Sequence, residues 1–303
     1  QGHLTRMFDI IPQLDCAGRI LRLDRPQVMG IVNVTPDSFS DGGAHDSVEA
    51  AVAHGLRLAE EGADLLDIGG ESTRPGAQDV AVEEELRRVI PVIERLAKQT
   101  SLPISIDTSK PEVMRAAVEA GAGMINDVFG LRREGALDMA ATLGVPVVLM
   151  HMQGEPRSMQ EAPAYDDVVA EVHRFLAERI FSAEMAGIAR KDIVVDPGFG
   201  FGKDTRHNLQ LLAQLQRFTE LGVPVLAGLS RKKTIGELTG RNDPRERVSG
   251  SVAAHLIAAQ RGALLLRVHD VAATVDALKV WNALVAMPMP RVQAKPEIRW
   301  PDD

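Results

Sequence analysis

Eight short apolar segments recur along the chain, and each is followed by a polar loop and a longer segment with helical periodicity. Their starts lie about 34 residues apart on average, which suits one strand followed by one helix. Most are apolar throughout rather than alternating, as expected for parallel strands buried on both faces. The repeat therefore predicts an α/β fold with a parallel sheet. The segments are 28–34, 64–69, 103–107, 123–127, 145–150, 193–196, 223–228 and 263–268.

Eight strand–helix units in one chain favour a closed (β/α)8 TIM barrel. The count of strands does not show closure, so an open doubly wound sheet stays the alternative. We expect one domain over residues 4–286, because α/β barrels of this length are commonly single domains. Residues 7–25 predict a short β-hairpin that turns near residues 17–18 and plugs the barrel floor. Residues 287–303 are Pro-rich and predict an irregular tail, and residues 1–3 are interpreted as a tag remnant.

Three local signals concern the helices. Asp46 or Ser47 is expected to cap the first helix. The run Ser-Lys-Pro-Glu at residues 109–112 predicts a capping box at the start of the third helix, with proline in its first turn. Pro91 is expected to kink or divide the second helix.

Charge and cysteine content exclude several classes of protein. The net charge of -8 carries no basic excess, so a nucleic-acid partner is not expected. No apolar run approaches the roughly 18 residues that a membrane-spanning helix needs. Cys16 is the single cysteine, which excludes an internal disulfide and a Cys-rich metal site. We therefore expect a cytoplasmic protein that acts on small molecules.

Polar residues stand at the ends of several predicted strands, where TIM barrels place their active sites. Asp107, Asn126 and Asp196 end the third, fourth and sixth strands. A carboxylate accepts two parallel N–H donors from a flat heterocycle, and an amide offers one donor and one acceptor. Together these groups suit a flat polar ring such as a pterin.

Basic residues gather at the ends of the last two strands. Lys232 follows the seventh strand, and Arg267 and His269 belong to the eighth. TIM barrels frequently bind phosphate at this place, and cations there also stabilise a departing diphosphate.

Long segments of the chain closely resemble the signature segments of dihydropteroate synthases. The resemblance extends in the right order over roughly residues 15–285. It implies a TIM-barrel enzyme of folate biosynthesis that condenses 6-hydroxymethyl-7,8-dihydropterin diphosphate with p-aminobenzoate to give 7,8-dihydropteroate and pyrophosphate. The segments are MGIVNVTPDSF (29–39), DIGGESTRPG (67–76), DPGFGFGK (196–203), SRK (230–232) and RVHD (267–270).

The resemblance implies roles for individual residues. Asp107, Lys232 and Arg267 are implied to be catalytic, and the pterin is held by Asp107, Asn126, Asp196 and Lys232. The implied diphosphate site is Asn33, Thr73, Arg74, Arg267 and His269, with Asn33 also contacting Mg2+. The implied p-aminobenzoate site is Thr73, Pro75, Phe201 and Ser230, with Lys232 beside it.

Further properties follow from the same resemblance. The loops after the first and second strands are implied to close over the site, and a homodimer is implied to form through the outer helices. The family is also a sulfonamide target. We expect an SN1-like path in which diphosphate departs before the aniline attacks.

Simpler interpretations of the same residues stay open. Asp107 alternatively caps the third helix, although Thr108 and Ser109 already offer that cap. Asn126 and Asp196 alternatively brace loops, and His151 is either a packed histidine or a ligand contact. Residues 198–202 lack the glycine spacing of a dinucleotide site, which favours a loop that needs a special backbone shape. Other charged residues near the strand ends are interpreted as hydrogen-bond partners, ion-pair partners or solvated charges: Asp67, Glu71, Arg231 and Lys233.

Other functions remain as alternatives. A metal-dependent hydrolase needs a His-x-His cluster after the first strand, and residues 33–35 offer none. A methyltetrahydrofolate-binding methyltransferase shares the barrel and much of the pterin pocket, but it does not need the cations near residues 230–232 and 267–269. A non-catalytic pterin-binding paralogue would bind pterin without turnover.

Overall fold

A computed structural model describes residues 12–34, 44–72, 79–154, 159 and 163–287. Eight parallel strands close into a barrel in the order β10-β3-β4-β5-β6-β7-β8-β9. Each predicted apolar segment holds one of these strands, so the TIM barrel is confirmed and the open sheet is wrong. The strands are β3 (Gln27–Asn33), β4 (Leu65–Gly69), β5 (Ile104–Asp107), β6 (Met124–Asp127), β7 (Val147–Met150), β8 (Ile193–Asp196), β9 (Val225–Ala227) and β10 (Ala263–Val268).

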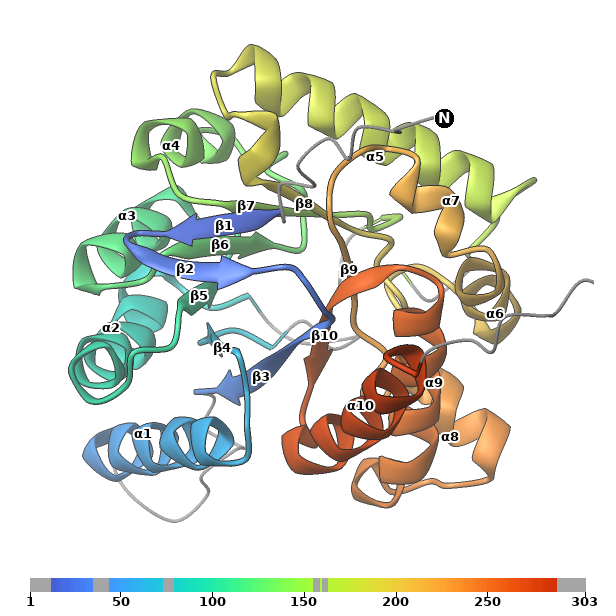
Figure 1. Ribbon diagram of the computed structural model, residues 1–303. Coiled ribbons are helices and arrows are strands. Elements are labelled where there is room, and N and C mark those ends of the chain that lie inside the picture. Colours follow the sequence, from blue (N-terminus) through green and yellow to red (C-terminus); the bar gives the residue numbers. More distant parts are fainter. Residues whose placement is uncertain (1–11, 35–43, 73–78, 155–158, 160–162, 288–303) are drawn as a thin grey trace, which may run out of the picture.

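The helices surround the strands in chain order, as Figure 1 shows. Asp167 illustrates how the local sequence starts a helix, because its carboxylate accepts the N–H groups of Val169 and Ala170 at 3.0 Å each. The helices are α1 (Ala44–Glu60), α2 (Val82–Gln99), α3 (Pro111–Ala120), α4 (Ala136–Leu143), α5 (Val168–Met185), α6 (Thr205–Ala213), α7 (Gln216–Thr219), α8 (Lys233–Thr239), α9 (Val248–Gln260) and α10 (Val271–Val285), with 3-10 turns at Arg190–Asp192 and Pro244–Glu246.

Two predicted helix caps are wrong. Helix α1 begins at Ala44, so Asp46 and Ser47 lie inside its first turn. Helix α3 does begin with proline directly after β5, but its N-cap is Lys110 and no side chain caps it.

Buried ion pairs, rather than a capping box, anchor the residue before α3. The Lys110 ammonium donates to Glu71 and to Glu85 at 2.5 Å each, which fixes the backbone at the helix start. Pro91 lies within α2, which continues from Val82 to Gln99, so division of this helix is excluded.

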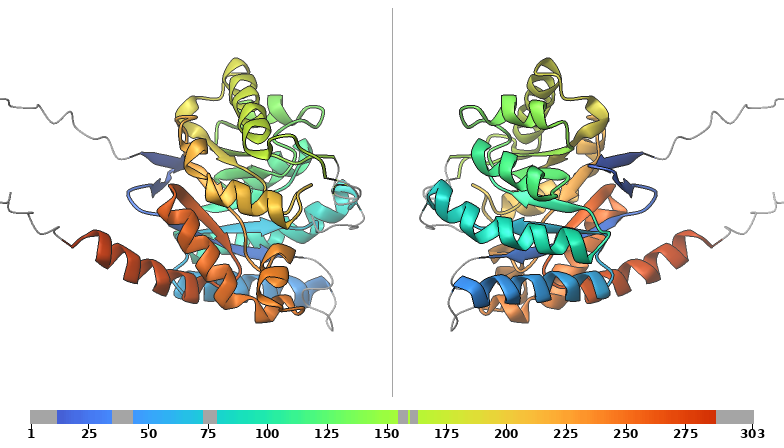
Figure 2. Two further views of the ribbon diagram at one scale, coloured as in Figure 1. Left: turned by 90° about the vertical axis from the view of Figure 1, so that its right-hand side faces the viewer. Right: turned by 90° about the vertical axis from the view of Figure 1, so that its left-hand side faces the viewer.

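A β-hairpin closes one end of the barrel, as predicted (Figure 2). Its strands are β1 (Gln13–Cys16) and β2 (Arg19–Arg22), and Ala17 and Gly18 form the turn with φ of 54° and 86°. Gly123 precedes β6 where the hairpin passes closely, because a Cβ atom there would lie 2.3 Å from the Cys16 carbonyl oxygen. The hairpin side chains Leu14, Cys16, Leu21 and Leu23 pack on a floor of Met29, Leu65, Met124, Val148, Val194, Leu226 and Leu265.

Polar side chains form the next layer above this apolar floor. Residues two positions apart on a strand point to the same face, so each floor residue is followed by another inward-facing residue. Leu65 is followed by Asp67, and Leu265 is followed by Arg267. Met124 leads in the same way to Asn126, and Val194 leads to Asp196. The alternation of side chains along each strand therefore places polar groups inside the mouth, directly above the apolar floor.

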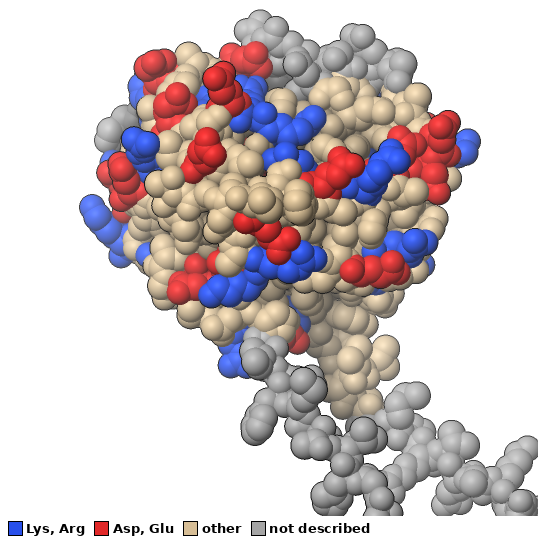
Figure 3. Space-filling model, turned by 90° about the horizontal axis from the view of Figure 1, so that it is seen from above, with Lys and Arg blue, Asp and Glu red and all other residues tan. Residues whose placement is uncertain are grey.

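The outer surface carries charges of both signs. On the face in Figure 3, acidic side chains (red) and basic side chains (blue) are interspersed. Within the described parts of the chain, no helix has the length and apolar character to cross a membrane. Helix α10 extends beyond the barrel on the hairpin side (Figure 2), and its last turns expose apolar residues such as Val280 and Leu284.

Candidate active site

The strand register brings three of the expected site residues, Asn33, Asp107 and Asn126, into one row with Gly69. Asn33 lies opposite Gly69, Gly69 lies opposite Asp107, and Asp107 lies opposite Asn126. The row crosses β3, β4, β5 and β6 at their carboxyl ends. Residues that are far apart in the chain are thus neighbours because parallel strands end at the same rim.

Arg267 joins two carboxylates inside this rim. Its Nε donates to Asp67 Oδ2 at 2.6 Å, and its Nη2 donates to Asp107 Oδ2 at 2.8 Å. Asn126 Nδ2 donates to the same oxygen of Asp67 at 3.0 Å. The Asp67 side chain is 0% exposed, so this network lies within the barrel.

Asp67 lies at the centre of the mouth. It was interpreted as a structural hydrogen-bond partner for neighbouring loops, and its partners are instead side chains from β6 and β10. The sequence did carry a signal for this position. Asp67 is a lone carboxylate inside an otherwise apolar strand, two residues after the floor residue Leu65.

Two buried polar atoms near this network lack a hydrogen-bond partner among the described residues. They are Asp67 Oδ1 and Ser105 Oγ. Asp67 and Ser105 are opposite each other in the β4–β5 register. Buried polar atoms are ordinarily hydrogen-bonded, so unpaired ones beside an open mouth indicate a place for a polar ligand.

Burial also shifts the pKa of Asp107. It raises the pKa of this carboxyl to about 8, while the Arg267 charge acts against the rise and the Asp67 carboxylate adds to it. A ligand that donates N–H groups to Asp107 would favour its ionised form. A buried carboxyl with a raised pKa and a specific charged partner is typical of a functional site.

Asp196 and Lys232 form the opposite side of the mouth. Asp196 Oδ1 accepts the N–H of Gly198 at 2.7 Å, and burial raises the pKa of its carboxyl against the effect of the Lys232 charge. The Lys232 ammonium donates to the Phe199 carbonyl and lies 4.6 Å from the centre of the Phe201 ring. Burial lowers the pKa of Lys232 to about 8, although Asp196 opposes this shift.

A buried lysine organises the loop that carries Phe201. The Lys203 side chain donates to the Gly198 and Phe201 carbonyls and to His151 Nδ1, at 2.9 Å each. Lys203 is only 2% exposed, and burial lowers its pKa well below the usual range. This role of Lys203 has no signal in the local sequence, because nothing there shows that its head group turns inward.

Among the described residues, His151 is a packed histidine that supports the residue 198–202 loop. Burial, with the charge of Lys203 as the next cause, lowers the pKa of its imidazole to about 2, so the ring is neutral and accepts from Lys203. Its ring also meets Phe175 edge-on at 4.8 Å. The loop it supports has the expected special backbone, since Gly198, Gly200 and Gly202 have φ of 71°, 79° and 62°.

Ser230 and His269 meet at the ends of β9 and β10. Ser230 Oγ accepts the His269 N–H at 3.0 Å and lies 2.9 Å from His269 Nδ1. Arg231 pairs with Asp270, and Lys233 pairs loosely with Glu237 at 3.3 Å. The interpretation of Arg231 and Lys233 as ion-pair or solvated charges is confirmed.

Part of the expected site lies outside the described residues. Thr73, Arg74 and Pro75 belong to residues 73–78, and the loop after the first strand falls largely on residues 35–43. Across the described part of the chain, no cluster of three His, Cys, Asp or Glu residues is arranged to hold a metal ion. Asn33 Oδ1 and Asp107 Oδ2 face a common space, because a Cβ atom built on Gly69 would lie 3.8 Å and 3.6 Å from them.

Comparison with known proteins gives consistent relatives. A family model described as "Pterin binding enzyme" matches residues 29–269. The dihydropteroate synthase of Escherichia coli (strain K12) is 54% identical over 274 residues, which cover 90% of this chain and 97% of the relative.

Solved structures agree with these relatives. Dihydropteroate synthase of Xanthomonas albilineans with 4-aminobenzoic acid aligns with a TM-score of 0.88 and 77% identity, over 92% of this chain and 100% of that chain. Its complex with 7,8-dihydropteroate aligns with a TM-score of 0.84 and 74% identity, over 91% and 100%. The Yersinia pestis enzyme in a sulfonamide drug complex aligns with a TM-score of 0.87 and 49% identity, over 91% and 100%.

The raised pKa of Asp107 predicts a pH-dependent effect of Asp107→Asn on stability. A carboxyl whose folded-state pKa is raised to about 8 contributes stability below its unfolded pKa of about 3.9, and that contribution is lost as the pH rises through about 8. The melting temperature of Asp107→Asn relative to wild type should therefore increase from pH 5 to pH 8. Each kcal/mol of change in the free energy of unfolding corresponds to about 2–4 °C. Calorimetry at both pH values measures this, with the exposed Asp276→Asn as control. An equal offset at both pH values would contradict the expectation.

Proposed function

The chain belongs to the dihydropteroate synthase family of pterin-binding enzymes, and from that membership we propose how its barrel mouth binds and activates the two substrates. The reaction joins 6-hydroxymethyl-7,8-dihydropterin diphosphate to p-aminobenzoate and releases 7,8-dihydropteroate and pyrophosphate. The observation that carries the proposal is the buried network of Arg267, Asp67, Asp107 and Asn126 on the apolar floor.

The pterin ring is assigned to the carboxylate and amide groups of this network. Asp107 and Asp196 offer acceptors to ring N–H donors, and Asn126 and Lys232 complete the polar edge. Unpaired Asp67 Oδ1 and Ser105 Oγ support this assignment, because a polar heterocycle would satisfy buried groups that the described protein leaves unpaired. The Xanthomonas albilineans enzyme binds 7,8-dihydropteroate, which contains the same ring.

The diphosphate is assigned to Arg267, His269 and Asn33, together with Thr73 and Arg74, which lie outside the described residues. We assign Mg2+ to Asn33 as its protein ligand. Its amide oxygen is a suitable donor, and Mg2+ usually takes its other ligands from water and substrate phosphates. The lack of an acidic or histidine cluster among the described residues fits an ion held mainly by the diphosphate. When bound, Mg2+ would neutralise charge on the leaving group.

The p-aminobenzoate is assigned to Phe201 and Ser230 with Lys232 beside them, and to Thr73 and Pro75 outside the described residues. The Lys232 ammonium lies over the Phe201 ring, so this wall of the site presents an aromatic side chain and a cation together. Such a wall suits a flat aniline that carries a carboxylate. Because the Yersinia pestis relative forms a sulfonamide drug complex, we propose that sulfonamides compete with p-aminobenzoate here.

The reaction is proposed to be SN1-like. The bond between the pterin methylene carbon and the diphosphate oxygen breaks first, and its electron pair leaves with the diphosphate. Asp107 and Asp196 stabilise the electron-poor pterin, and Arg267 stabilises the departing charge. The aniline nitrogen then donates its lone pair to the carbon and loses a proton, which the released pyrophosphate accepts. No strong base is required, because an aniline is already nucleophilic near neutral pH.

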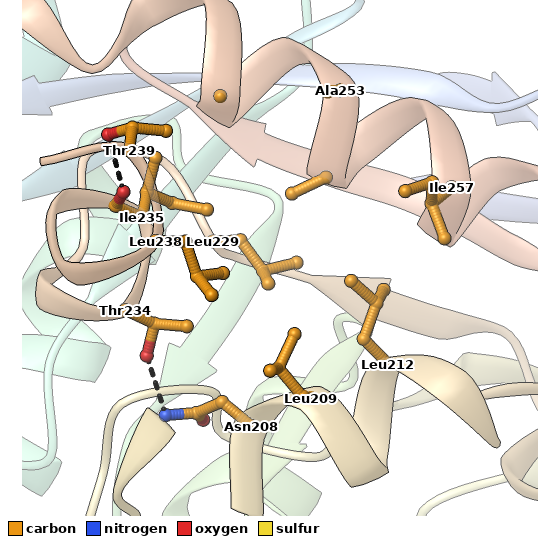
Figure 4. Close-up of a pocket in the computed structure, with 12 residues that line it drawn as sticks. Asn208, Leu209, Leu212, Leu229, Thr234, Ile235, Leu238, Thr239, Ala253 and Ile257 are labelled. Atoms are coloured by element: carbon orange, nitrogen blue, oxygen red, sulfur yellow. Dashed lines mark hydrogen bonds between the residues drawn. The ribbon is translucent and has the colours of Figure 1, made fainter. Parts of the chain in front are cut away.

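The outer helices supply a candidate face for a homodimer. Helices α6, α8 and α9 surround an apolar cavity of about 190 Å3 (Figure 4). Leu209, Leu238 and Ile257 come from these three helices and are exposed. The family resemblance implies a homodimer through the outer helices, and we assign this face to the second copy because pairing would cover the exposed leucines and isoleucine. A cytoplasmic location is proposed from the free, buried Cys16.

The first test of the reaction follows both products. With dihydropterin diphosphate, p-aminobenzoate and Mg2+, pyrophosphate and dihydropteroate should appear in equal amounts, and chelation of Mg2+ should lower both rates together. Equal release supports condensation at this site. Pterin binding without either product would sink the synthase reaction and favour the non-catalytic paralogue or the methyltransferase.

Arg267→Ala should reduce turnover far more than pterin binding. Loss of one group that stabilises transition-state charge typically costs about 10²–10³ in kcat. The affinity for 6-hydroxymethyl-7,8-dihydropterin, which lacks the diphosphate, should change by much less when measured by calorimetry. Lys233→Ala, which removes a nearby lysine whose side chain is 89% exposed, is the matched control. Equal losses of turnover and pterin affinity would count against a role on the leaving group.

Leu238→Glu should dissociate the proposed dimer. It places a charge at a side chain that is 54% exposed on the apolar face, so burial against a second copy becomes costly. Sedimentation should give twice the mass of the chain for wild type and close to one chain for the variant. Phe181→Glu on α5, at a side chain that is 65% exposed away from the cavity, should stay dimeric. A wild-type mass of one chain would overturn the assignment.

A further inference from the structure

The turn between β9 and α8 holds an unfavourable backbone conformation. It carries Ser230 and Lys232, and between them Arg231 has a φ of 57° although it is not a glycine. Such residues persist when their surroundings hold them, and they concentrate at functional sites. The side chains of Ser230 and Arg231 bind residues that follow β10, and Lys232 binds the residue 198–202 loop. The backbone of the turn is held by other residues, which belong to the α9 region.

Three residues of the α9 region hold that backbone. Arg247, the N-cap of α9, Ser251 and His255 are four residues apart and so lie along one face of the helix. His255 Nε2 accepts the N–H of Leu229 at 3.1 Å, and Ser251 Oγ accepts the N–H of Arg231 at 2.9 Å. Arg247 Nη1 donates to the Arg231 carbonyl at 2.9 Å. We call Arg247, Ser251 and His255 the α9 ladder.

A second hydrogen bond fixes the direction of the His255 and Ser251 bonds, and the Arg247 guanidinium can only donate. His255 Nδ1 donates to the Ser251 carbonyl at 2.7 Å, which leaves Nε2 as the acceptor for Leu229. The Ser251 hydroxyl donates to the Arg247 carbonyl at 2.7 Å, which leaves its oxygen to accept from Arg231.

Burial raises the energetic cost of losing the His255 and Ser251 hydrogen bonds. His255 is 0% exposed and Ser251 is nearly so, so a lost acceptor would leave a backbone N–H buried and unpaired. Burial lowers the pKa of His255 to about 4, so its ring stays neutral at ordinary pH and keeps its acceptor. The acceptor of His255 for the Leu229 N–H is therefore available at neutral pH.

We propose that the α9 ladder positions Lys232 for the condensation, so that a helix of the outer layer sets the geometry of the p-aminobenzoate side of the site. The ladder residues touch the backbone of the turn at Leu229 and Arg231 and act through Lys232. They are positioning residues. The inference rests on the proposed role of Lys232.

A variant pair at His255 separates the hydrogen bond from mere packing. His255→Phe keeps a ring but removes the acceptor for Leu229, and it should lower kcat/KM for p-aminobenzoate by tenfold or more. His255→Gln should recover most of that loss, because its amide oxygen can accept at the Nε2 position. Leu256→Ala removes half-buried packing from the same helix without touching the turn, and should retain kcat/KM. A loss in Leu256→Ala as large as that in His255→Phe would overturn the proposal.

A double-mutant cycle tests whether the ladder acts through Lys232. Lys232→Met alone should reduce kcat/KM strongly, and adding His255→Phe to it should cost little more. A further tenfold loss in the Lys232→Met background would overturn the ladder while leaving the role of Lys232 intact. Full activity of Lys232→Met would instead refute the proposed role of Lys232, and the ladder proposal with it. If His255→Phe does not fold, Ser251→Ala against Ser251→Thr makes the same comparison in the same cycle.

Discussion

The Arg267 guanidinium lies between the carboxylates of Asp67 and Asp107, inside the barrel and directly above an apolar floor. Buried ions are costly when unpaired, and two acids that share one cation remain partly uncompensated. Burial raises the pKa of Asp107, and the neighbouring Asp67 carboxylate adds to the rise, while Asp67 Oδ1 has no hydrogen-bond partner among the described residues. The free protein thus maintains, at a cost in stability, the charges and acceptors that a polar substrate would complete.

The floor makes this arrangement possible. The hairpin packs Leu14 and Leu21 against the inward side chains of the strands, so water is excluded below the polar layer. With no water beneath them, the polar groups can be approached only from the mouth. The close passage of Cys16 over Gly123 ties the hairpin to β6, the strand that carries Asn126. A low dielectric below and an opening above give the Arg267 network both its strength and its direction.

The sequence predicted what periodicity and topology determine. Apolar runs located the eight strands, and the rule that barrel sites occupy carboxyl ends brought Asp107, Asn126 and Asp196 to one rim. Pairings that join distant positions were not predictable, since Arg267 and Asp67 are 200 residues apart. The capping box of α3 failed for a related reason, because Lys110 is held by Glu71 and Glu85 instead. Predictions from local sequence are wrong where a buried tertiary contact is more favourable than the local interaction.

Two neighbouring loops show different ways of holding an unusual backbone next to a substrate. The residue 198–202 loop uses glycines, and a Cβ atom on Gly198 would lie 1.9 Å from the His151 carbonyl oxygen, so the fold admits no side chain there. The turn at Arg231 keeps its side chain, which pairs with Asp270, and relies on the α9 ladder to offset the left-handed conformation. Lys232 touches both, since it follows Arg231 and donates to the Phe199 carbonyl. Its position therefore depends on glycines and Lys203 on one side and on an outer helix on the other, which extends the functional site well beyond the residues that face the mouth.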